Sequence, residues 1–277
     1  MEKYSGRIFD NHFHLNPGSD FVNAVRIFRR SGGTSLNITN LPMHDTIDEY
    51  YQRLYDETVR MAKIVESETG VETLVTIGPY PFDYFFFESA GTDPVSIMQK
   101  GFDLAARYVE DGKADAIGEI GFPHVPQQEA VMQRFWEMLD YAMNVAHDAG
   151  SPIVIHTFDL SCKDYERIEK LADSHGSIAV VKHHARPADL SCMTRIVRSV
   201  PASRSAVRES LAISRDFLLE TDFINDPVDM NKFLPPDSVP KRAQMIIQEN
   251  EDGPEILNRI FNTLPESVYA RLRERRL

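Results

Sequence analysis

Short apolar segments alternate with longer amphipathic ones along the chain, and this alternation restricts the fold more than any other feature of the sequence. The short segments have the length and apolar composition of buried strands. The longer segments carry apolar residues at the spacing of one helix face. We therefore predict strands at residues 6–12, 34–40, 72–81, 114–121, 152–158, 178–184, 200–203 and 215–223. We predict helices at residues 19–33, 46–70, 93–113, 127–150, 163–176, 187–199, 203–214, 239–249 and 254–272.

Strands that are separated by helices form a parallel sheet, and eight such units in 277 residues are typical of a (β/α)₈ TIM barrel. The seventh strand is very short, so we expect the barrel to be distorted there. The competing fold is a doubly wound open sheet. Its nucleotide-binding versions carry a GxGxxG or Walker pattern, and the sequence has neither. No segment has the composition of a linker, so we predict one domain over residues 1–277.

Composition disfavours several classes of partner. The formal net charge is −12, whereas a domain that grips duplex DNA usually has a basic surface. The one basic stretch, residues 271–276, is expected to be the solvated end of a helix. No apolar run is long enough to span a membrane, and residues 1–10 lack the apolar region of a secretory signal. Cys162 and Cys192 are far apart in the sequence, so we expect no disulfide and a reducing cytoplasmic location.

Histidines and carboxylates follow the apolar part of five predicted strands. Because the carboxyl ends of barrel strands face the active site, we expect these side chains to meet in one mouth. Taken one at a time, each residue could have an ordinary structural role on a solvated strand face, as a core histidine or as a loop carboxylate. Five strands with such groups at the same end, however, are typical of a divalent-metal site. The residues are His12, His14, Glu119, His156, His183, His184, Glu220 and Asp222.

Five motifs carry a resemblance to a known family. In order they are "FDNHFHL", "IGEIGF", "VIHTFD", "VVKHH" and "LLETDF". Together they resemble the TatD family of metal-dependent hydrolases, which belongs to the amidohydrolase-like TIM barrels. The resemblance extends from Phe9 to Asn262. The chain departs from typical bacterial members in "GEIGFPHV", "VVKHHARP" and "ETDFINDP", and looks closer to a divergent TatD-related branch found in archaea.

The resemblance implies a site for two divalent ions, which could be zinc, manganese or magnesium. His12, His14 and Asp222 would bind the first ion, and His156 and one histidine of the sixth strand would bind the second. Glu119 would bridge the two ions. Asp222 would also accept a proton from the attacking water, so Asp222 and Glu119 are the expected catalytic residues.

His183 and His184 have opposite strand parity, so only one of them can point at the ions. If His184 pointed inward, the cation of Lys182 would lie beside the ions. If His183 pointed inward, Lys182 would face outward, where its long side chain could reach water. The resemblance also places the ligand directly after "VVK". We therefore predict His183 as the ligand and His184 as a residue of the rim or a substrate contact.

Other polar residues have weaker indications. Asp10 and Glu220 share the strand parity of the ligands and are expected to orient a ligand histidine. His124 could reach a substrate from its loop or simply be exposed, and Arg186 and Arg204 could bind a phosphate or form surface ion pairs. No role is predicted for His44, His147 and His175. The aromatic residues 80–90 could wall the pocket, stack a base, bury in a subunit contact or form a structural lid.

The expected activity is the hydrolysis of phosphodiester bonds in a small molecule or a single-stranded nucleic acid, as the family resemblance implies. The alternative is hydrolysis of a small amide, lactone or ester, because the same metal core supports many reactions. A binding barrel with a decayed site is disfavoured because every expected ligand position is filled. The sequence predicts no membrane partner and does not indicate an oligomeric state.

Overall fold

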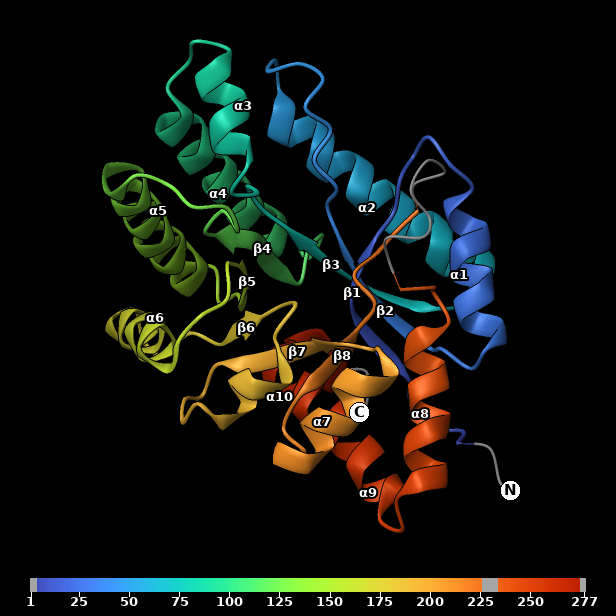
Figure 1. Cartoon of the computed structure of the whole chain (residues 1–277). Helices are drawn as coiled ribbons and strands as arrows, with labels where there is room; N and C mark the ends of the chain where they lie inside the picture. The colour runs from blue at the N-terminus through green and yellow to red at the C-terminus, as the bar shows by residue number, and fades with distance from the viewer. Residues whose placement is uncertain (1–3, 226–233, 275–277) are drawn as a thin grey trace.

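The computed structural model describes residues 4–225 and 234–274, and its strands form a closed barrel surrounded by helices (Figure 1). Within this part of the chain all strand pairs are parallel, in the order β8-β7-β6-β5-β4-β3-β2-β1-β9. The two ends of this order, β8 and β9, are neighbouring pieces of one chain segment. β8 pairs with β7 and β9 pairs with β1, so the segment closes the sheet on itself. The TIM-barrel prediction is confirmed.

The bounds of the elements follow the predicted alternation of strands and helices. The strands are β1 Phe9–His14, β2 Ser35–Thr39, β3 Glu72–Ile77, β4 Ala116–Gly121, β5 Ile153–His156, β6 Val180–Lys182, β7 Val197–Pro201, β8 Leu218–Glu220 and β9 Phe223–Ile224. The helices are α1 Phe21–Arg30, α2 Tyr50–Thr69, α3 Asp83–Ser89, α4 Pro94–Glu110, α5 Glu129–Asp148, α6 Cys162–Ser174, α7 Arg204–Ile213, α8 Ser238–Glu249, α9 Gly253–Asn258, α10 Leu264–Val268 and α11 Ala270–Glu274. Two short helical turns, η1 Pro187–Ser191 and η2 Arg259–Thr263, complete the described elements.

Helix ends follow from local chemistry. The Asp93 side chain accepts a hydrogen bond from the backbone of Ser96, and Pro94 occupies the first turn of α4, where it displaces no helical hydrogen bond. Gly70 ends α2 with a φ of 67°, a conformation that glycine adopts without steric cost. Both caps lie at the ends of the predicted helices, residues 46–70 and 93–113.

The core lies between the barrel and its helices. One cluster of buried apolar side chains lies under helices α1 to α6, and a second lies under α7 to α11. At the base of the barrel, the hydroxyl of Tyr269 donates to Asn11 and accepts from Asn37, which ties the C-terminal helices to β1 and β2. Within the described residues, no helix is long and apolar enough to cross a membrane.

The predicted helix at residues 187–199 is wrong. The chain forms only the 3₁₀ turn η1 and then enters β7 at Val197, so the seventh strand is longer than predicted. Val197 pairs with Val181 of β6. The buried guanidinium of Arg198 donates to the carbonyls of Cys192, Thr194 and Ile196. These contacts satisfy backbone groups that a helix would have paired internally.

The prediction of unpaired cysteines is also wrong. Cys162 and Cys192 form a disulfide with a Cα–Cα distance of 5.2 Å, although 30 positions separate them in the sequence. Cys162 is the first residue of α6, and Cys192 directly follows η1. The barrel brings the loops after β5 and β6 side by side, which the sequence spacing did not reveal. The cysteine argument for a reducing compartment therefore no longer holds.

Candidate metal centre

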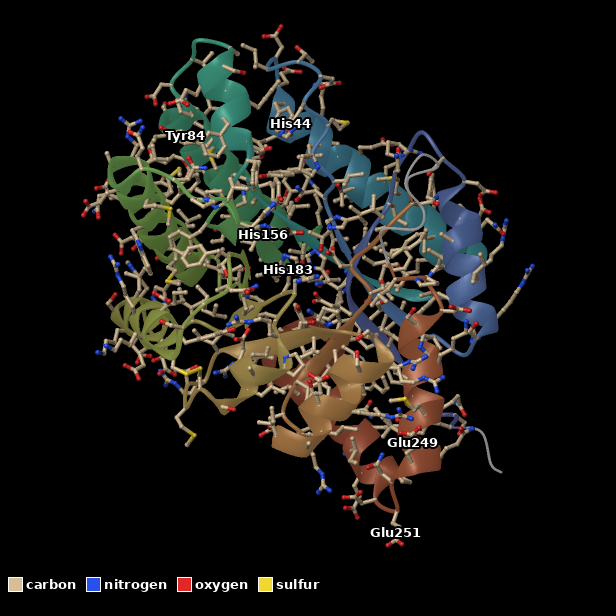
Figure 2. The ribbon with its side chains drawn as sticks, viewed as in Figure 1. His44, Tyr84, His156, His183, Glu249 and Glu251 are labelled. Carbon is tan, nitrogen blue, oxygen red and sulfur yellow. A yellow bond between two sulfur atoms is a disulfide. The ribbon has the colours of Figure 1, made fainter. Side chains whose placement is uncertain are left out.

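Six predicted site residues meet at the carboxyl ends of the strands. β1 supplies His12 and His14, and β4 and β5 supply Glu119 and His156. His183 directly follows β6, and Asp222 lies in the break between β8 and β9. Figure 2 shows His156 and His183 near the centre of the molecule, where the strands meet. Asp222 has the most exposed side chain of the six, at 25%.

Glu119 lies at the centre of this group. Its Oε1 atom is 2.5 Å from Nε2 of His12 and 3.2 Å from Nε2 of His14. Its Oε2 atom is 3.0 Å from Nδ1 of His156 and 3.3 Å from Nε2 of His183. Each carboxylate oxygen therefore faces a different pair of histidines.

Asp222 completes the half of the site formed by β1. Its Oδ1 atom is 3.4 Å from Nε2 of His14 and 3.9 Å from Nε2 of His12. The residue has a φ of 49°, which aspartate tolerates better than most residues, and its amide donates to the carbonyl of His12. This backbone turn aims the carboxylate at the histidines.

The donor set fits divalent metal ions. His12, His14 and Asp222 offer ligand atoms within 4.8 Å of one another, and so do His12, Glu119 and His183. Imidazole nitrogens and carboxylate oxygens are ligands for zinc and manganese. Nδ1 of His14 is 3.1 Å from the carbonyl of Thr39, which accepts its proton. In the neutral ring, Nε2 of His14 would therefore present a lone pair to the cluster, as a metal ligand requires.

Without metal ions, His14 and His183 hold protons between the carboxylates. Burial alone would lower the pKa of His14, but hydrogen bonds to Asp222 and Glu119 outweigh it and raise the pKa to about 10. Burial also opposes protonation of His183, but attraction to Glu119 and hydrogen bonds to Glu119 and Glu220 raise its pKa to about 10. For Glu119, attraction to His183 and His12 overcomes burial and holds the pKa well below its usual range. Burial lowers the pKa of His156 to about 4.

Glu220 and Asp10 lie behind the cluster but contact different groups. Oε1 of Glu220 is 3.5 Å from Nδ1 of His183 and accepts the amide of His184 at 2.6 Å. Asp10 instead accepts the amide of His12 and both the amide and the hydroxyl of Thr221. The expectation that Asp10 orients a histidine ring is therefore wrong. The register of the β1–β2 pair shifts between Asp10 and Phe13, so the regular alternation of side-chain direction along β1 is interrupted there.

The two histidines after β6 point to different places. His183 lies in the cluster, whereas His184 is exposed, with a φ of 50°. The expectation that Lys182 reaches water is wrong. Its side chain is buried, and Nζ turns back to donate to the carbonyl of His183. That carbonyl satisfies the ammonium group in place of solvent.

A cavity of 690 Å³ opens onto the cluster, with His124 and His184 in its lining. Thr157, Phe158 and Asp159 also line it, and sequence reasoning missed them. Their position directly after His156, at the end of a barrel strand, was the available signal.

The remaining candidate cations and histidines are engaged elsewhere or lie outside this lining. Arg186 pairs with Asp159 and Asp189, and Arg204 is exposed at the start of α7. His44 pairs with Asp83 beside α2 and α3 (Figure 2). His175 pairs with Asp140, and His147 is exposed on α5.

The barrel and the histidines and carboxylates at its mouth define a protein of the metal-dependent hydrolase type. A family model described as TatD related DNase matches residues 9–270, so the chain belongs to this family. The uncharacterized protein MJ1127 of Methanocaldococcus jannaschii is 27% identical over 274 residues, which cover 95% of each chain.

Solved structures share the fold. The phosphotriesterase homology protein of Escherichia coli, complexed with phosphate in its active site, superposes with a TM-score of 0.66 at 16% identity, covering 95% of this chain and 99% of that one. The organophosphorus hydrolase of Deinococcus radiodurans gives 0.62 at 14% identity, covering 95% and 92%. A mutant of a phosphotriesterase-like lactonase from Deinococcus radiodurans gives 0.58 at 15% identity, covering 92% and 95%.

Proposed function

We propose that this protein is a binuclear, divalent-metal-dependent phosphodiesterase that cleaves small phosphodiesters or the ends of single-stranded DNA. The observation that carries the proposal is the central position of Glu119. Because its two oxygens face separate pairs of histidines, one carboxylate can bind two ions at once. His12, His14 and Asp222 would hold the first ion. His156 and His183 would hold the second.

Bound divalent ions would supply a water of lowered pKa and would neutralise charge on the phosphoryl group. Asp222 is suited to accept the proton of the attacking water, because its carboxylate lines the cavity and keeps a partly exposed side chain. Its pKa is held below the usual range, mainly by hydrogen bonding to His14 and attraction to His183 and His12, against the opposing effect of burial. Asp222 is therefore ionised at neutral pH, which is the form in which a carboxylate can accept a proton.

A phosphodiester substrate is supported by membership of the TatD related DNase family. The net charge of −12 argues against tight binding of duplex DNA, because cationic side chains supply most of that affinity. A small phosphodiester or a single-stranded end needs fewer such contacts and can enter a cavity of this size.

The second candidate is hydrolysis of a small ester, lactone or amide. It is favoured by the state of Arg186, whose guanidinium pairs with the cavity residue Asp159 and with Asp189. A guanidinium held by two carboxylates is less available to an anionic phosphate. An uncharged substrate would not need it.

The test is the degradation of end-labelled single-stranded DNA by protein loaded with Mn²⁺, Mg²⁺ or Zn²⁺. Bis-p-nitrophenyl phosphate, p-nitrophenyl acetate and a simple lactone would be assayed in parallel. The control is Glu119→Gln, which keeps the size of the side chain and removes one ligand oxygen. Cleavage of a phosphodiester by the native protein and not by the variant would support the proposal. Turnover of only the ester or lactone would support the second candidate.

A further inference from the structure

His124 lies directly beside a candidate metal ligand and has no part in the proposed reaction so far. Its Nδ1 atom is 3.0 Å from Nε2 of His156. It comes from the loop after β4, and its exposed ring lines the cavity. In the sequence, this residue could equally reach a substrate or be a solvated loop histidine.

The orientation of His156 explains why a partner is needed there. Its Nδ1 atom faces Nε2 of His183 at 2.9 Å and Oε2 of Glu119 at 3.0 Å, so its Nε2 atom points away from the cluster. A histidine that binds a metal through one nitrogen carries its proton on the other, and that N–H usually donates to a carboxylate, a carbonyl or a water. The Thr39 carbonyl serves His14, and the Glu220 carboxylate faces His183. For His156, the partner is Nδ1 of His124.

Aromatic side chains hold both imidazole rings in this arrangement. The ring of Tyr80 meets His156 edge to face at 5.0 Å between centroids, and the ring of Phe82 contacts His124 at 4.8 Å. Tyr80 and Phe82 in turn stack on each other at 5.5 Å. Such contacts restrict the rotation of the imidazole rings by filling the space beside them.

The buried carboxylate of Asp83 fixes the segment that carries these aromatic rings. Its Oδ2 atom accepts the amide of Tyr80 at 3.0 Å and the hydroxyl of Tyr51 at 3.1 Å. Its Oδ1 atom accepts the hydroxyl of Tyr50 at 3.2 Å and faces Nε2 of His44 at 2.8 Å. The start of the aromatic segment is thereby tied to α2 and to the loop before it.

We propose that His124 is a positioning residue that accepts the Nε2 proton of His156, and that Tyr80 and Phe82 hold the two rings in place for binding of the second ion. The inference rests on the proposed function, because it assumes that His156 binds that ion. The hydrogen bond keeps the lone pair of His156 Nδ1 directed at Glu119 and His183. Loss of the acceptor frees the ring to rotate, so affinity for the second ion falls while affinity for the first is kept.

The experiment measures Zn²⁺ binding to metal-free protein by titration against a chromophoric chelator, with the bound zinc counted by elemental analysis. Four proteins are compared: the native chain, His124→Leu, His124→Asn and His147→Leu. The Asn oxygen replaces the acceptor Nδ1 atom, whereas Leu keeps only bulk. His147 is an exposed histidine of α5 outside the cavity and serves as the control. Thermal unfolding of each metal-free protein reports any general loss of structure.

We expect His124→Leu to lower the affinity for the second ion by roughly 10–100-fold, as is typical when the hydrogen-bond partner of a metal-binding histidine is removed. Its first binding constant and its unfolding temperature should stay unchanged, and His124→Asn should restore most of the lost affinity. An unchanged second constant in His124→Leu overturns the inference. So does an equal loss in both His124 variants or a loss of both ions together. If the native chain binds no second ion, the proposed binuclear function fails first, and the count of bound zinc distinguishes that outcome.

Discussion

The disulfide between Cys162 and Cys192 should contribute strongly to stability, because it closes a long loop between the segments that follow β5 and β6. The two residues are 30 positions apart. In the chain-entropy model, a cross-link over about 30 residues removes about 12 cal/mol/K from the unfolded ensemble, which is about 3.6 kcal/mol at 25 °C. Cys162→Ser and Cys192→Ser should therefore lower the free energy of unfolding by about that amount. For a domain of this size, the melting temperature should fall by roughly 7–14 °C.

The assay is urea unfolding of the native chain with and without a phosphine reductant, beside the double serine variant. Reductant should weaken the native chain to the level of the variant and leave the variant unchanged. Thiol titration of the denatured, unreduced chain should find no free thiol, although the sequence has two cysteines. Two free thiols in protein purified without reductant would refute the pairing. An intact disulfide with the stability of the serine variant would refute the entropic reasoning.

Three further perturbations test the site and its surroundings. Glu119→Gln should bind less metal, as measured by elemental analysis, and its kcat/KM should fall about a thousandfold, which equals about 4 kcal/mol. Full metal content with native turnover would contradict this. Metal binding at pH 7 should release up to two protons, because His14 and His183 have pKa values raised to about 10 and must lose a proton to bind metal. Calorimetry in buffers of different ionisation enthalpy counts the released protons. Because both values lie above the unfolded value of about 6.5, the stability that these histidines give the metal-free protein is full below that pH and is lost as pH rises through 10. Asp83→Leu should lower the free energy of unfolding, measured in urea, by roughly 3–5 kcal/mol, because it leaves buried hydrogen-bond donors without an acceptor. Native stability of the variant would show that these donors find other partners.

The order of the strands and the placement of ligand-type residues were predictable because both depend on residues close together in the sequence. A buried strand between helices has a local apolar pattern, and the residue that follows it lies at the same end of the barrel in every unit. His156 and His183 were found in this way after "PIVI" and "AVV". Local periodicity failed at residues 187–199, where pairing of Val197 with β6 and the contacts of Arg198 outweighed a helical pattern.

The sequence by itself determined the barrel, the family and the six residues that converge at its mouth. Only the tertiary structure decided how Glu119 divides its oxygens and that Cys162 meets Cys192. It also decided that Asp10 binds backbone amides and the Thr221 hydroxyl rather than an imidazole. It also brought His124 to the outer nitrogen of His156. The position of a residue along its strand fixes which end of the barrel its side chain occupies, and strand periodicity fixes the face to which it points. The contacts between side chains depend on register shifts and on loops far apart in the sequence, which local pattern does not encode.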